Sequence, residues 1–130
     1  MNDVTCSVDE FSETLANALS QFSDEETHEI KDIITKSATD CAKNIRADAP
    51  KRASTGNKYA KGWTCHKDGE TNLDIQYTIY NKSQPSLTHL LENGHAKVNG
   101  GRVEGIPHIA PNEKKMEQEI DKKINEMDGD

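Results

Sequence analysis

Apolar residues are scarce in this sequence: hydrophobic types make up 32% of its 130 residues and aromatic types only 5%. No stretch approaches the roughly 20 consecutive apolar residues that a membrane-spanning helix needs. The first residues are acidic and contain no apolar run, so we also expect no signal peptide. These gaps predict a soluble protein with a thin core that makes no membrane contact.

Cysteines are few, and their spacing is not that of a disulfide framework or a zinc site. Cys6, Cys41 and Cys65 are an odd number and include no Cys-x-x-Cys pair. We therefore expect a protein that is made in a reducing cytoplasm. Cys41 falls on an apolar helical stripe, which predicts a small core residue.

Motifs for catalysis and cofactor binding are also missing. There is no Gly-x-Ser-x-Gly segment, and Gly100-Gly101 is not followed by the Lys-Ser/Thr of a phosphate-binding loop. Cys65 and His66 are neighbours on an expected strand, where their side chains point to opposite faces. The sequence thus predicts a protein that is not an enzyme and uses no cofactor.

One group of residues has the chemistry of a metal site. His89, Glu92 and His95 carry imidazole and carboxylate ligands that zinc accepts. However, Gly94 is expected to end the helix that carries the first two, so His95 leaves their shared face. Histidines on an exposed loop are the favoured interpretation, and a metalloenzyme is kept as a minor alternative.

Charge is divided unevenly along the chain, whose net charge is −7. Residues 1–29 carry eight acids and no Lys or Arg, whereas residues 43–67 carry seven bases against the single acid Asp48. This division predicts surfaces of opposite sign, which can bring subunits together or bind a polyanion. Two differently solvated faces are the alternative.

Two helices are expected in the first 50 residues. Apolar residues recur at three- and four-residue steps over 8–22 and again over 30–49. Ser7 with Glu10, and Ser23 with Glu26, are typical of capping boxes at the two starts. Pro50 is expected to end the second helix.

Two strands and a last helix are expected in the remainder. Residues 59–66 and 73–80 alternate in polarity, with Asp68-Gly69 as the turn of a hairpin. Tyr59 and Trp63 are expected on its core face. Ser86 can cap a short helix that ends at Gly94, and residues 95–105 are expected to form a mobile loop or an exposed hairpin.

Pro111 suits the first turn of a last helix with the apolar stripe Met116, Ile120, Ile124 and Met127. The fold class expected is α+β: two N-terminal helices and a C-terminal helix packed on a small antiparallel sheet. We expect residues 1–130 to form one domain, with 1–7 and 128–130 frayed.

The basic residues 43–67 also raise a nucleic-acid alternative. They place Lys51, Arg52 and Lys58 near Tyr59 and Trp63, a mixture that can contact phosphates and stack on bases. Against this, both aromatic residues are expected in the core, and the chain as a whole is acidic. A small DNA-binding protein is therefore kept as the alternative function, with at most non-specific contact favoured.

The chain resembles a known family at two sets of residues. The first is Leu90-Leu91-Glu92-Asn93-Gly94-His95, Gly100-Gly101-Arg102-Val103 and Ile106-Pro107-His108-Ile109-Ala110-Pro111, and the second is Ala49-Pro50, Ser54-Thr55-Gly56 and Tyr59-Ala60-Lys61-Gly62-Trp63. In this order they are similar to the gp10-like minor structural proteins that join head to tail or complete the tail in long-tailed bacteriophages. The histidine-containing variants look like those of Gram-positive phages or prophages.

The resemblance implies a virion protein of the neck that acts through protein contacts, without catalytic residues. It implies a ring of identical subunits, expected to be hexameric, that touches neighbouring neck and tail proteins. Opposite-sign surfaces suit such head-to-tail contacts between subunits. The residues we expect at partner contacts lie in two exposed loops and are Lys51, Arg52, Lys58, His95, Lys97, Val98, Arg102 and Val103.

Overall fold

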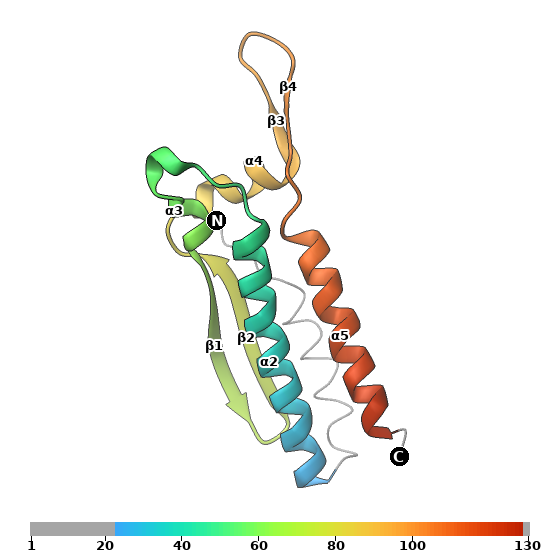
Figure 1. The fold of residues 1–130 in the computed structure, drawn as a ribbon. Coiled ribbons are helices and arrows are strands. Elements are labelled where there is room, and N and C mark those ends of the chain that lie inside the picture. Colours follow the sequence, from blue (N-terminus) through green and yellow to red (C-terminus); the bar gives the residue numbers. More distant parts are fainter. Residues whose placement is uncertain (1–22, 129–130) are drawn as a thin grey trace.

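The computed structural model describes residues 23–128 as helices around one two-stranded sheet, with a second small hairpin at one end (Figure 1). Helix α2 lies between the hairpin β1–β2 and the last helix α5. The α+β class is thus confirmed, while the helix expected over 8–22 and its Ser7–Glu10 cap lie outside the described residues. The elements in order are α2 (Asp24–Asp48), the 3₁₀ helix η1 (Ala53–Thr55), α3 (Lys58–Lys61), β1 (Trp63–Thr71), β2 (Asp74–Asn81), the 3₁₀ helix η2 (Pro85–Leu87), α4 (Thr88–Asn93), β3 (Gly94–Ala96), β4 (Arg102–Glu104) and α5 (Ala110–Asp128).

Helix α2 begins and ends where the sequence predicts. The Ser23 hydroxyl accepts the backbone N–H of Glu26, and the Glu26 carboxylate accepts the backbone N–H of Ser23, so the capping box is confirmed. Asp48 is the last helical residue, because Pro50 disfavours helical geometry at the residue before it. The 25 residues of α2 span about 37 Å. Its predicted apolar stripe is buried, Cys41 included, except for Ile33, which is partly buried at the margin.

The first strand differs from its prediction. Residues 59–61 belong to the short helix α3, and β1 begins only at Trp63. The expected strand over 59–66 is therefore wrong in its first half. Its cause lies in Gly56 and Asn57, which both adopt left-handed conformations and turn the chain into a helical turn. Tyr59 and Trp63 are buried, as predicted, although only Trp63 is in a strand.

The hairpin turn also lies elsewhere than predicted. Strands β1 and β2 pair antiparallel from Trp63↔Asn81 to Thr71↔Asp74, so the turn is at residues 72–73. Asp68 is instead the extra residue of a bulge between Lys67 and Gly69. Here the Asp68 carboxylate bonds the Thr78 hydroxyl and lies 3.0 Å from the His66 ring. The alternation in β2 is confirmed, with Ile75, Tyr77 and Ile79 all buried.

The segment after the sheet is helical, but its cap is not Ser86. That residue lies inside η2, and α4 begins after Leu87 with no side-chain cap. Pro85 starts the 3₁₀ turn one residue too early for Ser86 to take the capping position. Gly94 ends α4 with a positive φ of 79°, as expected.

The last helix closes the core. Pro111 is the second residue of α5, which confirms its place in the first turn. Met116 and Ile120 are almost fully buried and face α2, while Ile124 and Met127 pack at the margin. The resulting core draws on α2, α3, β1, β2 and α5, with Trp63 fully buried among them.

Candidate partner-binding surface

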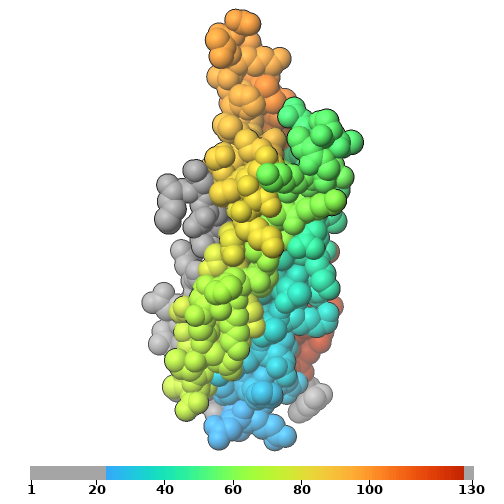
Figure 2. All heavy atoms as spheres, turned by 90° about the vertical axis from the view of Figure 1, so that its left-hand side faces the viewer, coloured from blue at the N-terminus to red at the C-terminus, as the bar shows by residue number. Residues whose placement is uncertain are grey.

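The predicted contact residues meet at one end of the molecule. Lys51, Arg52 and Lys58 lie on the segment 50–58 that follows α2, and the others lie on the hairpin β3–β4. Figure 1 shows both segments at the end where α2 terminates, and Figure 2 shows the hairpin as a narrow projection beyond the rest. All eight residues are exposed. The start of α2 lies at the opposite end.

The hairpin is short, exposed and well anchored. His95 pairs with Val103 and Ala96 with Arg102, so an exposed hairpin rather than an open loop forms here. The Lys97 N–H donates to the Gly101 carbonyl at 3.0 Å, and Gly100 and Gly101 both have positive φ. At its base, the Arg102 guanidinium donates to the Asn93 carbonyl. The side chain of Val98, at the tip, is fully exposed.

Glu92 and His108 join the hairpin to α5. The Glu92 carboxylate accepts the backbone N–H groups of His108 at 2.7 Å, Ile109 at 2.9 Å and Ala110 at 3.1 Å. These groups lead into the first turn of α5, where backbone N–H groups lack partners within the helix. Glu92 therefore positions the helix start. The Ile106 N–H also donates to the Leu91 carbonyl, at 2.8 Å.

His108 is fully buried behind this joint. Its Nδ1 lies 2.7 Å from the Ile106 carbonyl oxygen, which can only accept, so Nδ1 carries a proton. Its Nε2 lies 2.6 Å from the Tyr59 hydroxyl, which donates to it when the ring is neutral. Burial raises the pKa of Tyr59, so its phenol keeps that proton. The ring also makes an edge contact with Trp63, 6.0 Å between centroids.

The three residues of the metal-site alternative, His89, Glu92 and His95, do not point toward a common site. Glu92 points into the molecule, whereas His89 and His95 are exposed on α4 and β3. Within residues 23–128, no three His, Cys, Asp or Glu side chains are close enough to bind one metal ion. The thiol of Cys65 is half-buried, and burial raises its pKa to about 11. It is thus protonated at neutral pH and a poor nucleophile.

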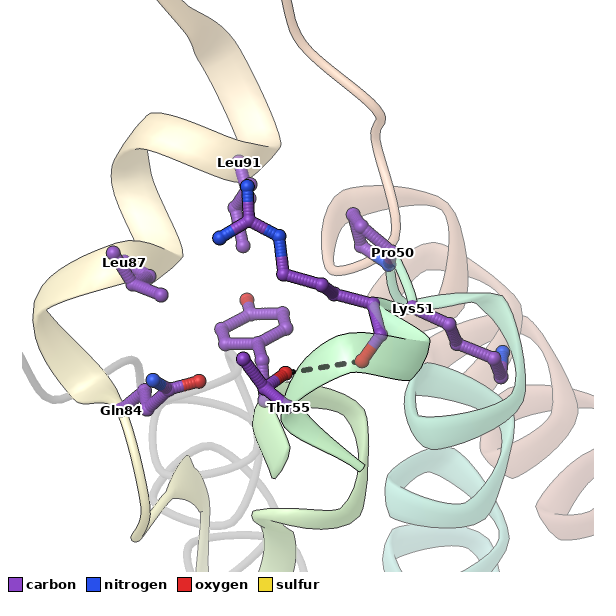
Figure 3. A pocket seen from close by; sticks show the side chains of 8 residues that line it. Pro50, Lys51, Thr55, Gln84, Leu87 and Leu91 are labelled. Atoms are coloured by element: carbon purple, nitrogen blue, oxygen red, sulfur yellow. Dashed lines mark hydrogen bonds between the residues drawn. The ribbon is translucent and has the colours of Figure 1, made fainter. Parts of the chain in front are cut away.

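A pocket of about 310 Å³ lies beside the segment 50–58 (Figure 3). Leu87 and Leu91, one helical turn apart, face Pro50 across it. Lys51 turns away from this pocket, and its ammonium group donates to the Ala47 and Ala49 carbonyls at the end of α2. Sequence reasoning missed the pocket, although the spacing of the two leucines signals one apolar face. The lining residues are Pro50, Lys51, Arg52, Thr55, Tyr59, Gln84, Leu87 and Leu91.

A second hollow, of about 510 Å³, lies between the last turns of α2 and α3. Four cationic side chains line it, from Lys43, Arg46, Lys51 and Lys61. Arg46 is held in place because its Nη2 donates to the Trp63 carbonyl at 2.6 Å. We call this concavity the basic hollow. It gives the positive residues 43–67 a defined shape, which sequence reasoning did not foresee.

Nucleic-acid stacking finds no aromatic platform here. Tyr59 is 5% exposed and Trp63 is not exposed at all, so neither can meet a base. These were the aromatic residues on which the DNA-binding alternative depended. What remains at this end is cationic and apolar surface, without a stacking site among the described aromatic residues of 43–67.

Fold and surface together define a small α+β protein whose prominent exposed features are a projecting hairpin and a basic hollow. The chain belongs to the HK97-gp10-like family: the sequence model of that family, described as "Bacteriophage HK97-gp10, putative tail-component", matches residues 13–94. The family is one of structural tail components of bacteriophages, and membership places the chain in the virion. No curated protein and no solved structure matches the chain. Within residues 23–128, no helix has the length and apolar character needed to cross a membrane.

Proposed function

We propose that the protein acts in the neck of the phage particle, where a hexameric ring of copies joins head to tail or completes the tail. The observation that carries this proposal is the projecting hairpin β3–β4. It projects beyond the body of the molecule (Figure 2) and carries the exposed Lys97 and Val98 near its tip, with Arg102 exposed closer to its base. Exposed apolar and cationic side chains on a rigid projection are suited to a protein partner.

The hairpin can reach well outside the subunit. Each of its strands has three residues and extends roughly 10 Å at the usual rise of a strand, with the turn 97–101 beyond it. Ile106, at its base, is half exposed and continues the apolar surface toward the body. A subunit with such an arm can contact a neighbour while its own core stays intact. This combination supports assembly by protein contacts, with DNA touched non-specifically at most.

A deletion of residues 97–103 tests this role. The arm makes no contribution to the buried core, so we expect the circular dichroism spectrum to stay close to that of the wild type. Phage carrying the deletion should yield filled heads and separate tails, visible by electron microscopy. Tails of abnormal length would instead assign the protein to tail completion.

A matched change is available on the other hairpin. Leu73 lies in the β1–β2 turn, is 45% exposed and is far from the arm. Its replacement, Leu73→Asn, should leave particles intact. Normal infectious virions from the 97–103 deletion would contradict the proposed function, and an equal defect from both changes would remove the special role of the arm.

A further inference from the structure

The exposed face of α2 changes sign along its length. Glu25, Glu29 and Asp32 are spaced by four and three residues, so they form one stripe opposite the buried side of the helix. Further along, the same stripe carries the exposed Lys36 and Lys43, with Asp40 between them paired to Lys36 at 3.0 Å. The one lysine within 24–32, Lys31, is buried and paired with Glu70 at 3.1 Å. Apart from His28, whose ring lies 3.8 Å from the Asp32 carboxylate, the titratable groups that the first turns of α2 present to solvent are acids.

The other end of this stripe forms part of the wall of the basic hollow. Lys43 lies on it, and Arg46, Lys51 and Lys61 complete the lining. Asp48 is the only acid in 43–67, and its carboxylate accepts the Asn112 side-chain amide at 2.9 Å. The hollow is therefore concave and positive, whereas the start of α2 is convex and negative.

We propose that the acidic start of α2 (residues 24–32) of a second copy docks in the basic hollow. This inference rests on the proposed ring and names the contact between its subunits. A helix with its side chains is about 10–12 Å across, so one 5.4 Å turn of it occupies roughly 500 Å³. The volume of the basic hollow, about 510 Å³, therefore suits one helical turn. Copies linked in this way contact one another head to tail, through two different surfaces.

This contact constrains the arrangement of subunits. The two surfaces lie at opposite ends of α2, about 30 Å apart along a rise of 1.5 Å per residue. In a ring, each acidic start can reach the next hollow only if α2 runs along the circumference. Such a ring uses each surface once, with a different neighbour on either side, so its assemblies exceed dimers. Two copies would close only as an antiparallel α2 pair, in which both contacts join the same two subunits.

A copy of the chain suits the hollow better than DNA does. The net charge of −7 repels a polyanion from the molecule as a whole, but a second copy offers its negative end alone. Arg46 and Lys51 already donate to backbone carbonyls, which fixes their positions before any partner arrives. Fixed cationic groups favour one defined partner surface over a mobile backbone.

Two charge-reversed variants test the contact in the full chain. One carries Lys43→Glu with Lys61→Glu, which puts two acids beside Arg46 and Lys51 and removes the net positive charge of the hollow. The other carries Glu25→Lys with Glu29→Lys, which puts two bases among Asp24, Glu26 and Asp32 and removes most of the negative charge at the start of α2. Glu26 is left unchanged because it forms the capping box. Circular dichroism establishes that each variant is folded. Sedimentation is measured at about 50 mM salt and again at about 300 mM salt, and at the higher concentration the electrostatic screening length falls well below 10 Å.

We expect the wild type to form assemblies larger than dimers at low salt, with association at least about ten-fold weaker at high salt. Each variant alone should be monomeric, and an equal mixture of the two should associate again, because opposite surfaces then meet. Rescue in the mixture separates this pairing from simple damage to the fold. It is also independent of the hairpin, so a failure here leaves the head–tail result to stand by itself.

Three results would overturn the inference. The first is a monomer for the wild type and for the mixture alike. The second is a wild type that stops at dimers, which indicates two α2 helices paired antiparallel. The third is a wild type that binds duplex DNA at low salt and loses it, together with any association, in the Lys43→Glu, Lys61→Glu variant.

Discussion

The side chain of Glu92 carries more of the structure than its place on a short surface helix suggests. It is 12% exposed, and its carboxylate accepts three successive backbone N–H groups at the entry to α5. Burial alone would raise its pKa, but the three N–H groups stabilise the charged form and lower the pKa below its usual 4.5. The charged carboxylate thus holds the last helix to the base of the hairpin.

Replacing this group should weaken the whole fold. In Glu92→Gln a single neutral oxygen faces three donors, so at least one of the three N–H groups loses its partner and the others lose a charged acceptor. We expect the free energy of unfolding to fall by about 1–2 kcal/mol at pH 7, measured by urea denaturation. Glu104→Gln, on exposed β4, is the matched control and should change it little.

The loss should depend on pH in a defined direction. Because the folded pKa of Glu92 lies below its unfolded value, the stability it adds is complete above about pH 4.5. That stability disappears as the pH falls through the lowered folded pKa. The stabilities of the wild type and Glu92→Gln should therefore converge as the pH is lowered through that folded pKa, whereas a gap that does not change with pH would assign the effect to packing.

Local patterns identify core residues but not their distant partners. The stripe on α2 and the alternation in β2 predicted Ile34, Ile45 and Ile79 as buried, because helix and strand periods fix which face a side chain takes. For Glu92, the local spacing to His89 and His95 indicates only a metal ligand. Its actual partners lie 16 to 18 residues away, and no local spacing encodes them.

The wrong strand start and the wrong hairpin turn share one cause, which is that contacts between elements decide them. The strand expected from Tyr59 and the turn expected at Asp68 both follow from polarity and turn propensity alone. In the structure, the Asn81 side-chain amide donates to the Tyr59 carbonyl at 2.7 Å and stabilises the helical turn α3. The hairpin register is set by Ile75, Tyr77 and Ile79 against α2, and Asp68 becomes a bulge within it.

Gly94 determines how the hairpin β3–β4 leaves α4. Its φ of 79° is costly for other residues, and a Cβ there would overlap the Val103 carbonyl oxygen and lie 2.7 Å from the Gly105 nitrogen. Gly94→Ala should therefore lower the free energy of unfolding by about 1–3 kcal/mol. Thermal unfolding followed by circular dichroism measures the loss.

Gly69 offers the comparison for this change. It lies in β1 without a positive φ, and a Cβ there would meet nothing within 4 Å. Gly69→Ala should unfold close to the wild-type temperature. If both substitutions lowered it equally, the conformation of Gly94 would not be what holds the hairpin in place.

At the scale of the whole molecule, one core joins elements from both halves of the chain. Trp63, the only tryptophan, is buried where α2, β1 and the joint to α5 meet, beside Tyr59 and His108. Asn112 ties α5 to α2 through Asp48, and Lys31 ties α2 to β1 through Glu70. No described element keeps an apolar core of its own, so the elements should not unfold separately.

This shared core predicts a single cooperative transition. Trp63 fluorescence reports on the packing around it, whereas circular dichroism at far-ultraviolet wavelengths is dominated by α2 and α5. Because both helices bury their apolar stripes in the same cluster, the two signals should change at the same urea concentration, with one slope. Helix signal that is lost before the fluorescence changes would show that α5 detaches first, and the chain would then comprise two cooperative units. Ile120→Ala, at the α2–α5 contact, provides the decisive comparison. In a single cooperative unit it lowers the free energy of unfolding by about 2–5 kcal/mol and shifts the urea midpoints of both signals together, although Trp63 lies on a different element.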